Sequence, residues 1–261
     1  MTVSRTLQVL GMFTVERPVL SIDWLVGRLQ VSRASVYRDV QELVQAGLLE
    51  KVDARGYALG ARIVELDRQI RLGDPLLHAA GPLPQQLARE SGGTVLLCRL
   101  HARTVLCILE VTGSAPGLTV SYERGRAMPL YRGATSKILL AHLPVSRLRQ
   151  LLEVDADALV DAGLPQTLPG LQQALAPLRA QGHVITRGEV DAHAVGLAAP
   201  LLDSARLLGS LSVVLPAARF TPATERRVLP LLKSCARRIE ARLENDRRRG
   251  QTLRTLHAPS T

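Results

Sequence analysis

Residues 32–47 combine hydrogen-bonding side chains with an apolar stripe at helical spacing, a pattern typical of a helix that enters the DNA major groove. Ser32 is a natural N-cap, because its hydroxyl can accept an unpaired backbone N–H of the first turn, and Gly47 is a natural stop. The apolar stripe consists of Val36, Val40, Leu43 and Val44. The candidate DNA contacts on and beside the opposite face are Arg33, Ala34, Ser35, Tyr37, Arg38 and Gln41.

Arg38 can reach either a guanine edge or a phosphate, and only the first contact reads sequence. Such a helix alone is more often a plain surface helix, so its neighbours decide the interpretation. Upstream, Ser21 precedes a short apolar helix at 22–29, and a tight turn joins that helix to the one that Ser32 begins. This order is that of a helix-turn-helix motif. Downstream, residues 48–59 alternate about a turn at 53–56, which predicts a hairpin. The segment order predicts a winged helix, with Arg55 at the wing tip placed to contact DNA.

The net charge of +10 suggests a polyanionic partner, but the charge is unevenly distributed. Residues 1–73 hold 10 Lys/Arg and 8 Asp/Glu, whereas residues 225–261 hold 10 and 4. Because the excess lies near the C-terminus, the order of motifs supports DNA binding better than the charge does. The absence of a long apolar run predicts no membrane span, and three cysteines together with no signal segment favour the cytoplasm.

The chain is long enough for two domains. A first helix is expected with Val3, Leu7, Leu10 and Phe13 facing inward. A linker helix is expected at 61–72, ended by Gly73 and the following Asp-Pro. We therefore expect a winged helix DNA-binding domain at 1–60, a linker helix at 61–73 and a second domain at 74–261.

The second domain alternates helix and strand patterns, which predicts an α+β fold with an antiparallel sheet. Prolines at 82 and 84 break a helix that runs to residue 91. The remaining expected helices are 133–143, 146–152, 168–181 and 222–249. The expected strands are 94–100, 104–111, 118–122, 184–189, 194–202 and 207–215.

No catalytic motif is present, and the histidines are scattered, so neither an enzyme nor a metal centre is indicated and no cofactor is expected. Cys98 and Cys107 lie symmetrically about the 102–103 turn. Two small apolar residues in a half-buried sheet are a better interpretation of this pair than a redox switch.

In order and spacing, the chain resembles the IclR family of bacterial transcriptional regulators over nearly its full length. SRASVYRDVQELVQAGLLE resembles the family's recognition helix and first wing strand, and GYALGARIVEL its second wing strand and linker helix. GRAMPLYRGATSKILLAHLP resembles a stretch usually ending in Gly-Lys-Ala-Leu-Leu-Ala, with Ser136 in place of that glycine. GHVITRGEVDAHAVGLAAPLLD resembles the segment that ends in Ala-Ala-Pro, with His193 where a glycine is usual.

The resemblance implies a GAF-like effector-binding domain and dimers or tetramers on operator DNA. It also implies an effector pocket between the sheet and the helix that begins near residue 133. A helix start suits a carboxylate, so we expect a small carboxylic acid, with Arg132 available to pair with it. The residues expected around this ligand are Leu130, Arg132, Ala134, Thr135, Thr186, Gly196, Ser212 and Val214.

The sequence thus predicts a DNA-binding regulator that responds to a small organic acid, of the kind that controls a catabolic operon. An α+β enzyme domain fused to a DNA-binding module is the alternative, and a winged-helix protein adaptor is a third. The first helix and the linker helix, with Leu66 and Ile70, are the expected dimer contact.

Overall fold

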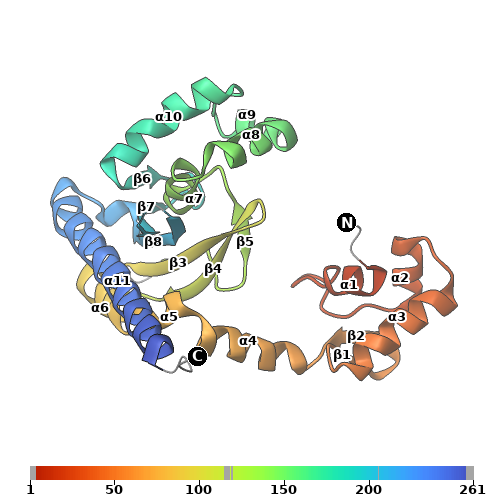
Figure 1. Cartoon of the computed structure of the whole chain (residues 1–261). Coiled ribbons are helices and arrows are strands. Elements are labelled where there is room, and N and C mark those ends of the chain that lie inside the picture. The colour runs from red at the N-terminus through yellow and green to blue at the C-terminus, as the bar shows by residue number, and fades with distance from the viewer. Residues whose placement is uncertain (1–3, 115–117, 119, 205, 257–261) are drawn as a thin grey trace. The chain divides into compact units, whose positions relative to one another are not determined.

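The computed structural model describes residues 4–114, 118, 120–204 and 206–256. The chain divides into two compact units, Met1–Asp74 and Pro75–Thr261 (Figure 1). Each unit has its own buried core. No helix among the described residues is both long and apolar enough to cross a membrane.

The first unit is a winged helix followed by a further helix. Its core consists of aliphatic side chains and one tyrosine, contributed by the helices and strands that precede the last helix. The elements are α1 (Arg5–Leu10), α2 (Ile22–Leu29), α3 (Arg33–Gln45), β1 (Leu49–Val52), a 3₁₀ turn (Asp53–Arg55), β2 (Gly56–Leu59) and α4 (Arg62–Gly73).

Local hydrogen bonds set the helix-turn-helix, as the sequence predicted. The hydroxyl of Ser21 accepts the Trp24 N–H at 3.2 Å, and that of Ser32 accepts the Ser35 N–H at 3.3 Å. Gln30 ends α2 in the left-handed conformation, with φ of 55°. Val36, Val40 and Leu43 on α3 are buried, so the predicted stripe is the face that holds α3 on its scaffold.

The wing is tied to the helices through its second strand. β1 and β2 pair antiparallel, and Tyr57 on β2 also exchanges two backbone hydrogen bonds of 2.9 Å with Leu20. Beyond the wing, the N–H of Gly60 donates to the Leu48 carbonyl at 2.8 Å. The predicted hairpin is therefore confirmed.

The inward face predicted for the first helix is wrong at one position. Leu7 is 54% exposed, and Val9 is the side chain that α1 buries. The described helix has only six residues, and it turns Arg5 and Thr6 toward α3, which leaves Leu7 on the outside. Val3 lies outside the described residues.

The second unit is a six-stranded antiparallel sheet with helices on both faces, as the α+β prediction requires. The strand order is β5-β4-β3-β8-β7-β6. The strands are β3 (Thr94–His101), β4 (Thr104–Val111), β5 (Ala127–Pro129), β6 (Val184–Arg187), β7 (Ala194–Asp203) and β8 (Arg206–Pro216). The helices are α5 (Pro75–Ala80), α6 (Leu83–Ser91), α7 (Ala134–Ala141), α8 (Val145–Val154), α9 (Ala156–Asp161), α10 (Leu168–Gln181) and α11 (Pro222–Leu256), with a 3₁₀ turn at Ala217–Arg219.

Strand alternation separates two cores, one on each face of the sheet. Odd-numbered residues of β7 and β8, such as Val195, Leu197 and Leu211, pack with α5, α6 and α11. The other face, toward α7, is made of small or polar residues where these two strands cross beneath the helix. This small-residue face allows α7 to lie close to the sheet and leaves room for a cavity at its start.

One strand predicted for the second unit is wrong, and some short elements were not predicted. Leu118, Val120 and Tyr122 alternate like a strand, but the described residues of this segment pair with no other strand. Instead, the N–H of Ser121 donates to the Asp191 carboxylate at 3.0 Å, and the apolar side chains pack into the core. The strand beside β4 is β5, only three residues long, and α9 was also not predicted because it is a short helix with no side-chain cap.

Cys98 and Cys107 are register partners across the β3–β4 hairpin, as predicted. Both thiols are free and buried. Burial raises the pKa of the Cys98 thiol well above its ordinary value, so the reactive thiolate is disfavoured. The geometry agrees with a packing role.

Candidate functional site

The exposed face of α3 carries several of the predicted DNA contacts. Ala34, Tyr37 and Arg38 are exposed, and Tyr37 is the large aromatic side chain on this face. Arg38 has no hydrogen-bond or ion-pair partner among the residues that the structure describes. Its guanidinium is therefore available to a base edge or a phosphate.

The other predicted DNA contacts are already engaged within the unit. Arg33 pairs with Asp23 on α2, and Arg55 pairs with Asp53 at 3.1 Å on the wing. The Ser35 hydroxyl lies 2.9 Å from that of Ser32, and Gln41 Nε2 donates to the Tyr57 hydroxyl at 3.4 Å. These pairs are exposed or half-buried, so DNA could exchange with them at small cost.

Sequence reasoning missed Asp39, a buried acid on the recognition helix. Its carboxylate accepts hydrogen bonds from Arg5, at 3.2 Å for Nη2, and from the Thr6 hydroxyl at 3.3 Å. Asp39 is 6% exposed, whereas the Arg5 side chain is 39% exposed. This pair fixes the angle between α1 and α3, and the i, i+3 spacing of Asp39 from Val36 could have indicated its inward position.

We expect Arg5→Ala to destabilise the first unit more than Asp39→Asn does. Losing Arg5 leaves a buried carboxylate with only a threonine donor, which costs about 1–3 kcal/mol. Losing the charge of Asp39 leaves an arginine that water can reach, so the cost is smaller. Urea unfolding of both variants measures the difference, and equal stabilities would contradict a buried role for Asp39.

In the second unit, a cavity lies between the start of α7 and the sheet. Thr186, Gly196 and Val214 are cross-strand neighbours on β6, β7 and β8, so they form one row across its floor. Ala134 and Thr135 border the row from the first turn of α7. Five of the eight predicted effector contacts therefore surround one cavity.

Ser212 lies next to this cavity, and its hydroxyl is 2.9 Å from that of Thr135. Both residues are buried. The two hydroxyls therefore satisfy each other. Leu130 is buried in the core on the α7 side and does not line the cavity. Arg132 is exposed and donates to the Asp161 carbonyl at 2.8 Å, so it does not point at the ligand position that we predicted.

Glu189 closes one side of the cavity and was not predicted. Its carboxylate accepts the Gly133 N–H at 3.0 Å and pairs with Lys137 at 2.6 Å. Gly133 has φ of 83°, and a β-carbon there would lie 2.8 Å from Val190, so only glycine fits. The acid thus holds the 188–191 loop against the start of α7, where the helix dipole favours a negative charge.

A second set of bonds closes the other side. Asp191 binds both the N–H and the hydroxyl of Ser121. The Tyr122 hydroxyl is 2.7 Å from that of Ser136, which in turn donates to the Pro129 carbonyl at 2.7 Å. Because Ser136 gives its one proton to the Pro129 carbonyl, the Tyr122 hydroxyl is the donor to Ser136, and burial raises the pKa of Tyr122. Ser136, a departure from the family pattern, thereby anchors the loop that carries Val120 and Tyr122.

The cavity enclosed by these loops has a volume of only about 30 Å³. That is room for about one water molecule. An organic ligand bound there would need more room than this cavity gives, so the surrounding side chains or loops would have to move. Within the described residues, no group of three or more histidine, cysteine or acidic side chains is arranged to hold a metal ion.

A winged helix with an exposed recognition face, joined in one chain to an α+β unit with an internal cavity, defines the class of ligand-responsive transcriptional regulators. Comparison with known families specifies the class further. Residues 2–53 match the IclR helix-turn-helix domain, and residues 73–241 match the C-terminal domain of bacterial transcriptional regulators of the IclR type. The chain belongs to the IclR family.

Curated relatives span nearly the whole chain. The regulator KdgR of Escherichia coli is 26% identical over 93% of each chain. The Pca regulon regulatory protein of Pseudomonas putida is 26% identical, over 90% of this chain and 81% of its own. Both relatives are regulatory proteins by name.

Solved structures share the fold. A putative IclR regulator from Silicibacter sp. TM1040 has a TM-score of 0.76 and 23% identity, over 91% of this chain and 94% of its own. An IclR homologue from Microbacterium hydrocarbonoxydans, in complex with 4-hydroxybenzoate, has a TM-score of 0.75 and 22% identity, over 92% and 98%.

Proposed function

We propose that this regulator binds an operator through residues 1–60, transmits a signal through residues 61–73 and senses a small organic acid through residues 74–261, in control of a catabolic operon in the cytoplasm. The observation that best supports the proposed ligand site is the row formed by Thr186, Gly196 and Val214 beneath the start of α7. Ligand binding would shift the population between arrangements that differ in DNA affinity.

The start of α7 supports a carboxylate ligand. Ala134 and Thr135 both line the cavity, and N–H groups of the first turn have no acceptor within a helix. Thr135 and Ser212 add hydroxyls that can turn from each other to a ligand. Glu189 is already neutralised by Lys137, which limits its repulsion of a second anion. The relative bound to 4-hydroxybenzoate supports an aromatic acid.

A thermal-shift screen of aromatic and short aliphatic carboxylic acids, beginning with 4-hydroxybenzoate, tests the proposal. An effector present at 100 times its dissociation constant should stabilise the protein by about 2.7 kcal/mol. No stabilisation by any acid would contradict the ligand class and leave the DNA-binding function untouched.

Thr135→Ala combined with Ser212→Ala should remove about 1–3 kcal/mol of that stabilisation, because a buried carboxylate would lose two donors. Each single variant leaves one buried hydroxyl unpaired, whereas the double variant leaves none, so the double variant should fold at least as stably as either single one. Ser210→Ala on the same face of β8 is the matched control. A double variant that responds to ligand like the parent would place the ligand elsewhere.

We further propose a homodimer, or a tetramer built from dimers, formed through α1 and α4. No residue of α4 is fully buried, and Val64, Ile70 and Leu72 are 70%, 63% and 66% exposed. Exposed apolar side chains on one helix are typical of a protein contact surface. Leu66 is half-buried on the same helix.

Ile70→Glu should therefore shift the protein toward monomer in analytical sedimentation and weaken operator binding, since each subunit would lose its partner's half-site. Gln69→Glu adds the same charge at the neighbouring exposed position and should leave the assembly unchanged. A fully dimeric Ile70→Glu variant would exclude this helix as the contact.

A further inference from the structure

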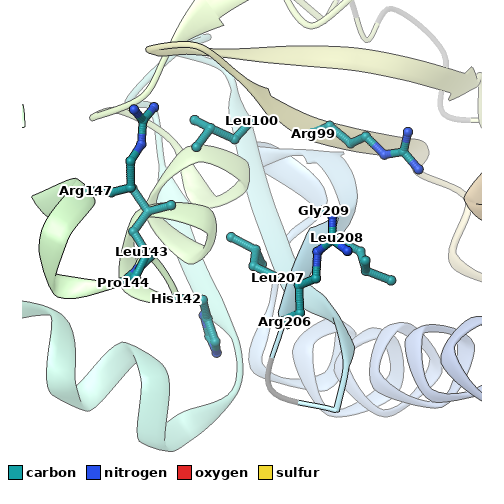
Figure 2. A pocket seen from close by; sticks show the side chains of 10 residues that line it. All are labelled: Arg99, Leu100, His142, Leu143, Pro144, Arg147, Arg206, Leu207, Leu208 and Gly209. Carbon is teal, nitrogen blue, oxygen red and sulfur yellow. The ribbon is translucent and has the colours of Figure 1, made fainter.

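A second and larger cavity lies at the opposite end of α7 from the effector cavity. Its volume is about 720 Å³, within the range of about 300–1,000 Å³ that is usual for small-molecule sites. It shares no lining residue with the first cavity. The lining comes from β3, from β8 and from the α7–α8 junction (Figure 2).

The cavity exists because two strands diverge. β3 pairs with β8 only as far as Cys98–Ser210, and beyond that point each strand pairs only with its other neighbour. Gly209 marks the fork, since a β-carbon there would lie 2.4 Å from the Cys98 carbonyl oxygen. The fork exposes a floor that includes Leu100 and Leu207.

The rim is cationic, and none of the described residues that line the cavity is acidic. Figure 2 shows Arg147 on one side of Leu100 and Leu207, with Arg206 and Arg99 on the other. Arg147 is held by the Ala102 carbonyl at 2.7 Å and the Gln150 side chain at 2.6 Å, both neutral partners that leave its charge uncompensated. Arg206 has no hydrogen-bond or ion-pair partner among the described residues.

The adjacent helix ends favour an anion as well. Pro144, the N-cap of α8, lines the cavity, and the first turn of α8 has neither an acidic residue nor a side-chain cap. The last carbonyls of α7 would repel an anion, but all four accept hydrogen bonds. Those of Leu139 and Leu140 bind backbone N–H groups, and that of Ala141 binds Arg179 Nε at 2.7 Å. The Ile138 carbonyl accepts from His142 Nδ1 at 2.9 Å.

We propose that this cavity is a second ligand site, for an amphiphilic anion with an apolar body and one terminal carboxylate or phosphate. The leucines would cover the body, and Arg206 would bind the headgroup with charge-assisted hydrogen bonds. Because the site lies at the far end of α7, it does not depend on the identity of the effector at the first cavity.

Titration of the full-length protein with anilinonaphthalene sulfonate, an amphiphilic anion whose fluorescence rises on binding, tests the proposal. Arg206→Gln should weaken probe binding about tenfold, because a charge-assisted contact is lost. The Arg206 side chain has no partner among the described residues, so its removal should not affect folding, which a thermal melt verifies. Arg149→Gln, an exposed arginine on α8 that does not line the cavity, is the matched control.

Competition identifies the headgroup. Octanoate and octyl phosphate should displace the probe, whereas octanol should not. Whichever of the two anions displaces the probe at the lower concentration identifies the preferred headgroup. Gly196→Val, which fills the first cavity, should leave probe binding unchanged. The proposal is overturned if the parent binds no probe, if Arg206→Gln and Arg149→Gln behave alike, or if octanol competes as well as octanoate. Probe binding that appears only on dilution would show instead that a second copy of the chain covers the cavity.

Discussion

Arg38→Ala should weaken binding of the regulator to its operator by about 1–3 kcal/mol, or up to about 100-fold, if Arg38 reads a base. Arg38 is the exposed arginine on α3 that has no partner within the part of the chain that the structure describes. Its charge is therefore not shared with a protein acid, in contrast to that of Arg33, which pairs with Asp23. Fluorescence anisotropy with an operator selected from random DNA measures the loss.

The salt dependence of that loss separates two roles for Arg38. A base contact should relax sequence preference at one operator position, whereas a phosphate contact should weaken all sequences alike and lower the salt slope by about one. Gln45→Ala, at the exposed C-terminal end of the same helix, is the control. Unchanged affinity in Arg38→Ala would remove α3 from the recognition role.

The first unit could be predicted from sequence because its structure is determined by local signals. Ser21 and Ser32 cap α2 and α3 as expected, and Gly47, which follows the end of α3, has a φ of 71°. Both the helix-turn-helix and the wing are formed by residues close together in sequence, so spacing alone defines them. The inward position predicted for Leu7 is wrong, because an ion pair between Arg5 and Asp39, 34 residues apart, decides how α1 packs.

The second unit shows where local signals are insufficient. The alternation of Leu118, Val120 and Tyr122 reflects packing against one side, and their segment is held by the side chain of Asp191, 70 residues away from Ser121. β5 is too short to give a periodic signal and forms because β4 has a free edge. Glu189 was not predicted, because its role depends on the distant Gly133 and Lys137.

Five of the residues proposed as effector contacts line one cavity, and strand register is the reason that they come together. Thr186, Gly196 and Val214 come together because antiparallel pairing places them opposite one another across three strands. Arg132 was expected there because it lies just before α7. A residue that precedes a helix can, however, point a long side chain toward solvent. Its bond to the Asp161 carbonyl on α9 holds it outside.

Gly196→Val should abolish effector binding while leaving operator binding intact. The floor of the cavity belongs to a six-stranded sheet, so it should yield to a ligand less readily than the loops over the cavity. A β-carbon on Gly196 would lie 3.3 Å from that of Ala134, and the two methyl groups of valine would project into a cavity of about 30 Å³. Overpacking of this kind costs about 1–3 kcal/mol of stability, so the variant should still fold.

The expected loss is at least about 100-fold in ligand affinity, equivalent to about 2.7 kcal/mol, measured by calorimetry with 4-hydroxybenzoate or the acid that the thermal screen identifies. Gly196→Ala provides the graded comparison, because one methyl group makes a tight contact without filling the space. Its ligand affinity should lie between those of the parent and Gly196→Val. Operator affinity without ligand, measured by anisotropy, should be equal in all three proteins, since Gly196 is part of the second unit. If Gly196→Val binds the acid as tightly as the parent, the ligand does not lie above the row formed by Thr186, Gly196 and Val214.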